Sequence, residues 1–192
     1  MIQLLAKKLS NFLIESGLPS ENIEIYSYGA ECFLNLLICN SLLLFFGFST
    51  HHLIEILLWI ISFSCLRHHI GGYHANSHIS CISLSVLLGI LSITINTIFE
   101  TQPILIYIPI IFCIFCIAKL APVLHLNHPI TDVQKRKAHT NAIITLLVEL
   151  ISFFFLYLNQ LTIAYSIITG IFTASLCCLM GHIKNRKETI MF

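Results

Sequence analysis

Charged residues are scarce in this sequence. Of its 192 residues only 10% are Asp, Glu, Lys or Arg, whereas soluble domains average about 25%. Apolar residues make up 57% of the chain, and the mean hydropathy is +0.89. These values exclude an ordinary soluble protein and predict an integral membrane protein. The net charge of +1 gives no indication of nucleic-acid binding.

The sequence also lacks a linker rich in Pro, Gly or Ser, a low-complexity tract and an evident internal repeat. We therefore expect one integral membrane domain over residues 1–192. No long apolar segment with a small-residue cleavage site stands at the N-terminus, so a removable signal is not predicted. Instead, Leu5, Leu9, Phe12 and Leu13 recur at helical spacing, which predicts an amphipathic helix lying in the membrane interface.

Long apolar runs fill most of the remaining chain. An α-helix rises 1.5 Å per residue, so roughly 20 mainly apolar residues cross a hydrocarbon core of about 30 Å. The predicted fold class is therefore an all-α, polytopic membrane protein with about six transmembrane helices. The expected spans are approximately 30–48, 50–66, 79–98, 103–121, 142–158 and 161–182.

The ten basic residues are placed unevenly along these spans. Loops between six spans alternate between the two sides of the membrane, and every Lys and Arg falls on the side that carries both termini. By the positive-inside rule, both termini and the loops after the second and fourth spans are predicted to be cytoplasmic. The basic residues are Lys7, Lys8, Arg67, Lys119, Lys135, Arg136, Lys137, Lys184, Arg186 and Lys187.

One polar stretch lies between the second and third spans. Residues 67–81 read RHHIGGYHANSHISC and contain four His, a Gly-Gly pair and a Cys. A Cys attacks as the thiolate, and a nearby His can take its proton, which makes His74 and Cys81 candidates for a catalytic pair. In one continuous helix their Cα atoms would lie about 10.5 Å apart along the axis, too far for a direct hydrogen bond. The chain must fold back to bring them together.

The surrounding residues permit this bend. Gly71 and Gly72 tolerate unusual backbone angles, and Asn76 or Ser77 can cap a new helix. Cys81 would then occupy the first turn of that helix. Backbone N–H groups and the positive end of the helix dipole lower a thiol pKa there, and the same donors can stabilise an oxyanion. A Cys–His dyad is one interpretation of the stretch.

Two other interpretations remain open from the residues alone. Imidazole and thiolate ligands suit Zn²⁺, so His68, His69, His74 and His78 together with Cys81 also permit a metal site. The spacing matches neither H-E-x-x-H nor paired C-x₂-C motifs. Alternatively, the His and the Cys are purely structural. The other seven Cys lie within apolar runs, where a free Cys behaves as a small hydrophobe.

Several stretches resemble the accessory gene regulator B (AgrB) peptidases. The most specific is R-x-x-x-G-G-x-H-A at residues 67–75, followed by a Cys seven residues after the His. Residues 25–34, IYSYGAECFL, are similar to the family's approach to its first span. Residues 121–139, APVLHLNHPITDVQKRKAH, resemble its Ala-Pro, Asn-x-Pro and basic loop. The resemblance covers nearly the whole chain, although His128 stands where family members often have a basic residue.

The resemblance implies a cysteine endopeptidase in the bacterial cell membrane that acts in quorum sensing. Such an enzyme cleaves the C-terminal tail from an AgrD-like propeptide through a thioester acyl-enzyme and promotes cyclisation to a thiolactone or lactone. Carried over by residue, Cys81 is the nucleophile and His74 the base. The resemblance implies no metal or organic cofactor, and it suggests a homodimer. The expected partners are the propeptide and membrane lipid, without nucleic acid.

Four basic residues are candidates for binding the precursor. Lys135, Arg136 and Lys137 form a cluster on the cytoplasmic side and are expected to contact an acidic precursor tail. The alternative is that this cluster only sets the topology of the protein. Arg67 has the same two interpretations.

Two acidic residues lie in or at the edge of spans, where ionisable groups are often functional. Glu31 and Glu149 are therefore candidates to orient His74. An Asn, either Asn35 or Asn76, is an alternative for that role.

Two functions compete with the peptidase, and the three predict different experimental results. A small multispan transporter or metal-handling protein would use the His-rich cytoplasmic loop to gather cations, so its His residues would matter equally. A peptidase would need only His74 and Cys81. A structural membrane partner without chemistry would show no thiolate reactivity.

Overall fold

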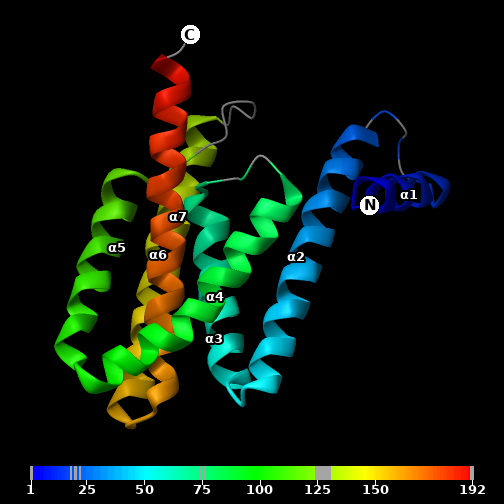
Figure 1. Cartoon of the computed structure of the whole chain (residues 1–192). Coiled ribbons are helices and arrows are strands. Elements are labelled where there is room, and N and C mark those ends of the chain that lie inside the picture. The colour runs from blue at the N-terminus through cyan, green and yellow to red at the C-terminus, as the bar shows by residue number, and fades with distance from the viewer. Residues whose placement is uncertain are drawn as a thin grey trace.

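The computed structural model describes residues 2–190 apart from residues 18, 20, 22, 74, 76 and 124–130, and apart from the side chains of 187–190. The described part is all-α, as predicted (Figure 1). The α-helices are α1 (Ile2–Glu15), α2 (Ile23–Ser49), α3 (Leu53–Ile70), α4 (His78–Thr101), α5 (Tyr107–Lys119), α6 (Asp132–Leu158) and α7 (Tyr165–Ile190). Short 3₁₀ helices, η2 (Pro103–Ile106) and η3 (Thr162–Ala164), precede α5 and α7.

Among the described residues, five helices are long and apolar enough to cross a membrane. They are α2, α3, α4, α6 and α7, and the shorter apolar stretch Pro103–Lys119 forms a sixth candidate. The prediction of about six spans in an all-α membrane protein is confirmed. The short length of the fourth span, with Pro103 at the start of η2 and Pro109 inside α5, was not foreseen.

The helix of the fifth span begins well before residue 142, where the apolar span was predicted to start. α6 begins at Asp132, because a capping box forms immediately before it. The hydroxyl of Thr131 accepts a hydrogen bond from the backbone N–H of Gln134, and the Gln134 side chain accepts one from the N–H of Thr131. The polar segment from Asp132 to Asn141 is therefore helical and continuous with the apolar span.

The N-terminal amphipathic helix is confirmed as α1, which lies crosswise to α2 (Figure 1). Ala6 and Ser10 are buried on one face, while Leu5 and Phe12 are exposed. A helix that keeps large apolar side chains exposed beside a bundle of spans suits the boundary between lipid and water.

α7 lies at the centre of the bundle. Of its apolar 18-residue stretch 72% is buried, compared with 11% to 28% of the corresponding stretch in each of the other spans. Small and hydroxyl-bearing side chains allow the other helices to approach it closely. Several of their hydroxyl groups are hydrogen-bonded: Thr173 donates to the carbonyl of Thr169, and Ser166 is 2.8 Å from the amide of Asn96 on α4. This packing places α3, α4 and α5 around α7.

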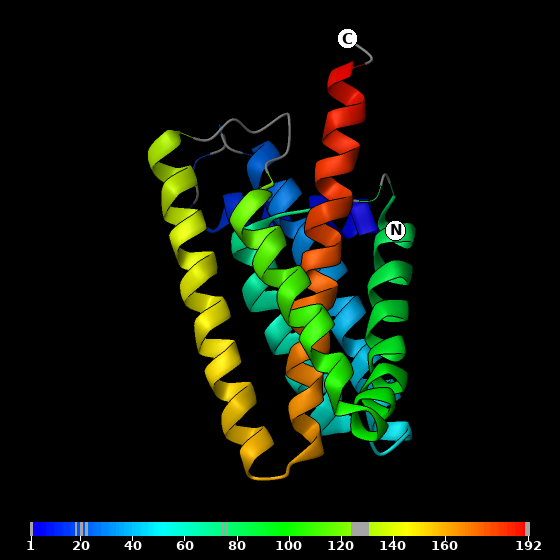
Figure 2. The same ribbon diagram turned by 90° about the vertical axis from the view of Figure 1, so that its left-hand side faces the viewer.

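The spans alternate in direction, so one end of the bundle collects the chain ends and three of its connections (Figures 1 and 2). Here α2, α4 and α6 begin and α3 and α5 end, and the last turns of α7 project beyond it. The basic residues of the described chain all lie in these elements or in α1, near this end. We call it the basic end.

Candidate active site

Cys81 lies in the first turn of α4, as predicted. Ser77 caps this helix, and its hydroxyl accepts a hydrogen bond of 3.1 Å from the backbone N–H of Ser80. The thiol is free and half-buried. This position at a helix N-terminus favours the thiolate. The N–H of Cys81 itself donates to the Ser77 carbonyl over 3.1 Å, and stabilisation of an oxyanion by the other N–H groups at this helix start stays a prediction.

The predicted base, His74, lies outside the described residues, as does Asn76. Its two chain neighbours are described, and both Tyr73 and Ala75 line the same cavity as Cys81. The loop therefore passes the cavity on both sides of position 74. Most of the loop before α6, including His128, also lies outside the described residues.

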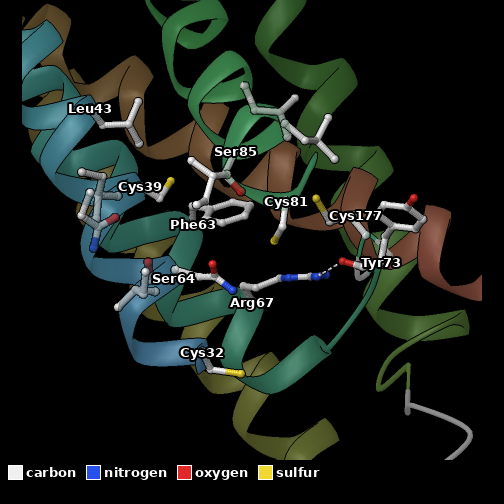
Figure 3. Close-up of a pocket in the computed structure, with 18 of the residues that line it drawn as sticks. Cys32, Cys39, Leu43, Phe63, Ser64, Arg67, Tyr73, Cys81, Ser85 and Cys177 are labelled. Atoms are coloured by element: carbon white, nitrogen blue, oxygen red, sulfur yellow. Dashed lines mark hydrogen bonds between the residues drawn. The ribbon is translucent and has the colours of Figure 1, made fainter. Parts of the chain in front are cut away.

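Arg67, in the last turn of α3, holds the loop that follows it. Its Nη1 donates to the carbonyl of Gly71 over 2.6 Å, and its Nη2 donates to the carbonyl of Tyr73 (Figure 3). The guanidinium is a rigid fork, so these two bonds set the path of the backbone just before His74. Binding of the precursor by Arg67 stays a prediction, and the contacts in place add a positioning role.

The Gly-Gly pair produces the expected bend. Gly71 and Gly72 have φ angles of +67° and +133°, which L side chains rarely adopt. A Cβ on Gly71 would collide with the carbonyl of Val123, to which the Gly71 backbone is bridged. A Cβ on Gly72 would collide with the guanidinium of Arg67 and come within 2.6 Å of the Cys177 carbonyl. Both positions need Gly for conformation and for space.

α7 supports the other side of the loop. The N–H of Tyr73 donates to the carbonyl of Cys177 over 2.8 Å, and the ammonium of Lys184 lies 5.3 Å from the Tyr73 ring centroid. Gly181 packs directly against the backbone of residues 72 and 73. Sequence reasoning missed this contribution. A Gly and a Cys one helical turn apart in the last span are too weak a signal to identify a contact with a distant loop.

A cavity of about 270 Å³ opens beside Cys81 (Figure 3). α2, α3 and α4 form its walls, and the loop and Cys177 of α7 close its remaining side. Most of the lining is apolar. The polar lining groups, besides the thiols, are Asn35, Asn40, Ser64, Arg67, Tyr73 and Ser85.

His78 contacts α2, a role that no sequence pattern distinguishes from those of the other His residues. Its Nδ1 is 2.8 Å from Nδ2 of Asn35, and its Nε2 is 3.2 Å from Oε2 of Glu31. One neutral tautomer satisfies both contacts, because Nδ1 accepts and Nε2–H donates. These bonds attach the start of α4 to α2 one turn before Cys81. Whether Glu31 or Asn35 also orients His74 stays a prediction.

Glu149 lies elsewhere, in a groove between α3 and α6 that His68 and His69 also line. Its Oε2 is 3.1 Å from the hydroxyl of Ser62, which is also 3.1 Å from the carbonyl of Ile167. None of these residues lines the Cys81 cavity. The structure thus places His68, His69 and Glu149 outside the Cys81 cavity, and orientation of His74 by Glu149 stays a prediction.

The basic cluster Lys135, Arg136 and Lys137 is exposed on the first turns of α6. It shares the basic end with the Cys81 cavity but does not line it. Figure 2 shows α6 and α4 on opposite flanks of the bundle. Among the described residues, no three His, Cys, Asp or Glu side chains gather as metal ligands do.

The sequence profile of the accessory gene regulator B (AgrB) family matches residues 6–180. The chain belongs to the AgrB family. It is 27% identical over 199 residues to AgrB-like protein 2 of Clostridium perfringens strain 13, covering 95% of this chain and 91% of that protein. It is 28% identical over 142 residues to an AgrB-like protein of strain SM101, covering 70% of this chain and 65% of that protein. No solved structure matches the chain.

Membership of the AgrB family supports a role in the agr quorum-sensing system. The matched residues include α2 to α5, the loop with the Gly-Gly pair, Cys81, the basic cluster and Cys177 of α7, whose carbonyl accepts from Tyr73. The elements that build the cavity therefore all belong to the family region of the chain.

Proposed function

We propose that this AgrB-family protein is a membrane cysteine endopeptidase that removes the C-terminal tail of an AgrD-like propeptide. The observation that carries the proposal is the position of Cys81. It lies in the capped first turn of α4 and lines a cavity together with Tyr73 and Ala75, the neighbours of His74. A nucleophile at a helix N-terminus, facing a cavity bordered by a His-bearing loop, is suited to acyl transfer.

In the first step His74 takes the proton of the Cys81 thiol. The thiolate attacks the carbonyl carbon at the C-terminal end of the future signal, and a C–S bond forms. The C–N bond to the tail then breaks, and His74 returns the proton to the leaving amine. The tail departs, and the signal segment remains as a thioester on Cys81.

In the second step a Cys or Ser within the signal segment closes the ring. His74 takes its proton, the new thiolate or alkoxide attacks the thioester carbonyl, and the Cys81 thiolate leaves. Exchange of one thioester for another is close to balanced, so a site that excludes water favours cyclisation over hydrolysis. The apolar lining of the cavity supports this preference.

The remaining parts of the proposal concern placement. The protein lies in the bacterial cell membrane with both termini in the cytoplasm. The exposed basic cluster of residues 135–137 contacts the acidic tail of the precursor. The working unit is a homodimer. Clustering of the described basic residues at one end of the bundle supports the orientation.

The test is co-expression with an AgrD-like precursor, followed by mass spectrometry of the products. Cys81→Ala and His74→Ala should each abolish cleavage while the protein still inserts into the membrane. Cys65→Ala and His68→Ala are matched controls, because both side chains lie on the groove between α3 and α6, and both should keep at least partial activity.

An acyl-enzyme provides a direct readout. When the ring-closing residue of the precursor is replaced by Ala, a thioester on Cys81 that hydroxylamine cleaves should accumulate. Normal cleavage by Cys81→Ala would assign the chemistry to another nucleophile. Loss of cleavage on chelation, restored by Zn²⁺, would instead favour the metal-handling alternative.

A further inference from the structure

The cavity beside Cys81 extends from the nucleophile into the apolar part of the bundle. Cys81, Ser85 and Leu88 occupy successive turns of one face of α4, and all three line it. Seven residues of helix span about 10.5 Å. Asn35, Cys39 and Leu43 follow the same course on α2, and Trp59, Phe63 and Arg67 follow it on α3. The cavity is therefore an elongated pocket with the thiol near its mouth.

The size and lining of this pocket suit one large apolar side chain. A dry cavity of about 150 Å³ already accommodates benzene, and this one measures about 270 Å³. Its deep wall contains Leu43 and Trp59, each 1% exposed, and the ring of Phe63 stacks on Trp59 with a centroid distance of 4.9 Å. The indole N–H of Trp59 is buried in this wall and has no hydrogen-bond partner among the described residues.

The deep, apolar part of the pocket does not suit an acidic group. Arg67 is its only Lys or Arg among the described lining residues, and both of its terminal nitrogens are bonded to carbonyls of the loop. Trp59 and Arg67 are eight residues apart on α3, about 12 Å along the helix axis, so a carboxylate beside Trp59 would be buried away from this cation, which is costly. The exposed basic cluster on α6 lies on the opposite flank of the bundle. The apolar part of the substrate therefore enters the pocket, and the acidic tail stays at the basic end.

Reaction geometry identifies which residue enters. The attacked carbonyl carbon must lie about 3 to 3.5 Å from the sulfur. The side chain on the adjacent Cα is then the substrate group closest to the pocket beneath the thiol. Ser85 is one turn below Cys81 and faces the same space (Figure 3), so it contacts the base of that side chain.

We propose that this pocket binds the side chain of the residue whose carbonyl Cys81 attacks, and that it selects an aromatic or long aliphatic residue. The inference rests on the proposed function of Cys81. Ser85 and Cys39 border the entrance of the pocket, and Trp59 limits its depth.

The experiment measures thioester formation on Cys81 with a precursor series that carries Ala, Leu or Phe at the position before the scissile bond. For the unchanged protein, kcat/KM should be about 10- to 100-fold higher with Leu or Phe than with Ala, as expected for an apolar pocket. Ser85→Phe fills the pocket, so it should lower cleavage of the Phe precursor at least about tenfold and spare the Ala precursor.

Leu87→Phe is the matched control, because Leu87 lies on the same helix with 53% of its surface exposed. It should leave the order of the precursors unchanged. Cys39→Phe fills the pocket from α2 and repeats the test should Ser85→Phe fail to insert.

Two outcomes contradict the inference, and they are distinguishable. Equal rates with Ala, Leu and Phe precursors, lowered by one common factor in Ser85→Phe, would remove the pocket from substrate selection and leave the peptidase function intact. No thioester on Cys81 with any precursor would overturn the proposed function and this inference together.

Discussion

Arg67 connects the end of α3 to the loop that carries His74. It belongs to α3, yet both of its terminal nitrogens bond to loop carbonyls, at Gly71 and Tyr73. Tyr73 is also held by its N–H to Cys177 of α7. The backbone before His74 is thereby held from two helices, and a general base needs such support, because proton transfer requires hydrogen-bond distance to the nucleophile.

Replacement of Arg67 by Lys should separate positioning from substrate binding. A single ammonium cannot reproduce the fork that reaches both carbonyls. Loss of one charge-assisted hydrogen bond costs about 1.5 to 3 kcal/mol, which corresponds to a roughly 10- to 100-fold slower reaction. We expect kcat to fall by this factor with little change in the KM of the precursor. A rise in KM at constant kcat would assign Arg67 to precursor binding instead.

Gly72 should tolerate no side chain. At its φ of +133°, Gly72→Ala is strained, and the new Cβ would displace the Arg67 guanidinium. We expect loss of cleavage, measured on protein that is shown to be inserted. Gly29→Ala is the matched control, because a Cβ at Gly29 meets nothing within 4 Å and Ala favours the α2 helix. Full activity of Gly72→Ala would contradict the structure of the loop.

At the scale of elements, the starts of α4 and α6 have different roles at the basic end. Ser77 caps α4 so that Cys81 lies in its first turn, beside the cavity. Thr131 and Gln134 cap α6, and the cluster Lys135, Arg136 and Lys137 follows on its exposed first turns. Both caps are made by local side chains, so each helix begins at a defined residue. The proposed nucleophile and the cations are consequently presented by different elements.

The basic cluster should affect precursor capture more than chemistry. Replacing Lys135, Arg136 and Lys137 together by Gln removes three exposed charges that do not line the cavity. We expect a higher KM for a precursor with an acidic tail, and little change in kcat. Raising the salt concentration should weaken binding to the unchanged protein in the same direction, because exposed charges are screened. Unchanged precursor affinity in a correctly inserted variant would leave the cluster with a topogenic role only.

At the scale of the whole molecule, the alternating spans bring the site and the basic residues to one end. α7 is the central helix, and the other spans expose large apolar side chains on their outer faces. Such surfaces suit contact with lipid tails. Because the described basic residues cluster at the end that carries the Cys81 loop, the positive-inside rule predicts that this end faces the cytoplasm.

Accessibility labelling tests this orientation. Single Cys residues placed at positions 70 and 137, in a background without other accessible Cys, should resist an impermeant thiol reagent applied to intact cells. Ile70 is fully buried, so its variant also needs a denaturing step that shows the thiol can react at all. Lys137 is exposed and gives the decisive reading. Labelling of position 137 from outside would reverse the proposed topology.

The membrane character, the approximate spans and the residues at which the loop bends follow from the amino-acid sequence alone. Apolar runs longer than a bilayer is thick need no tertiary information, and the Gly-Gly pair and the cap before Cys81 act through local backbone preferences. Local residue types made Cys81 a candidate nucleophile, the resemblance to the AgrB family assigned it that role, and the structure confirms its place in the first turn of α4.

Only the tertiary structure decided which side chains surround Cys81. Asn35, Trp59 and Cys177 come from three other helices, and His78 bonds to α2 although it resembles the other His in sequence. The physical reason is the solvent. Lipid tails are as apolar as a protein core, so a membrane helix can be apolar on every face, and its sequence does not reveal which face meets a neighbour. The rotation of each helix about its axis, and with it the pocket, follows from packing alone.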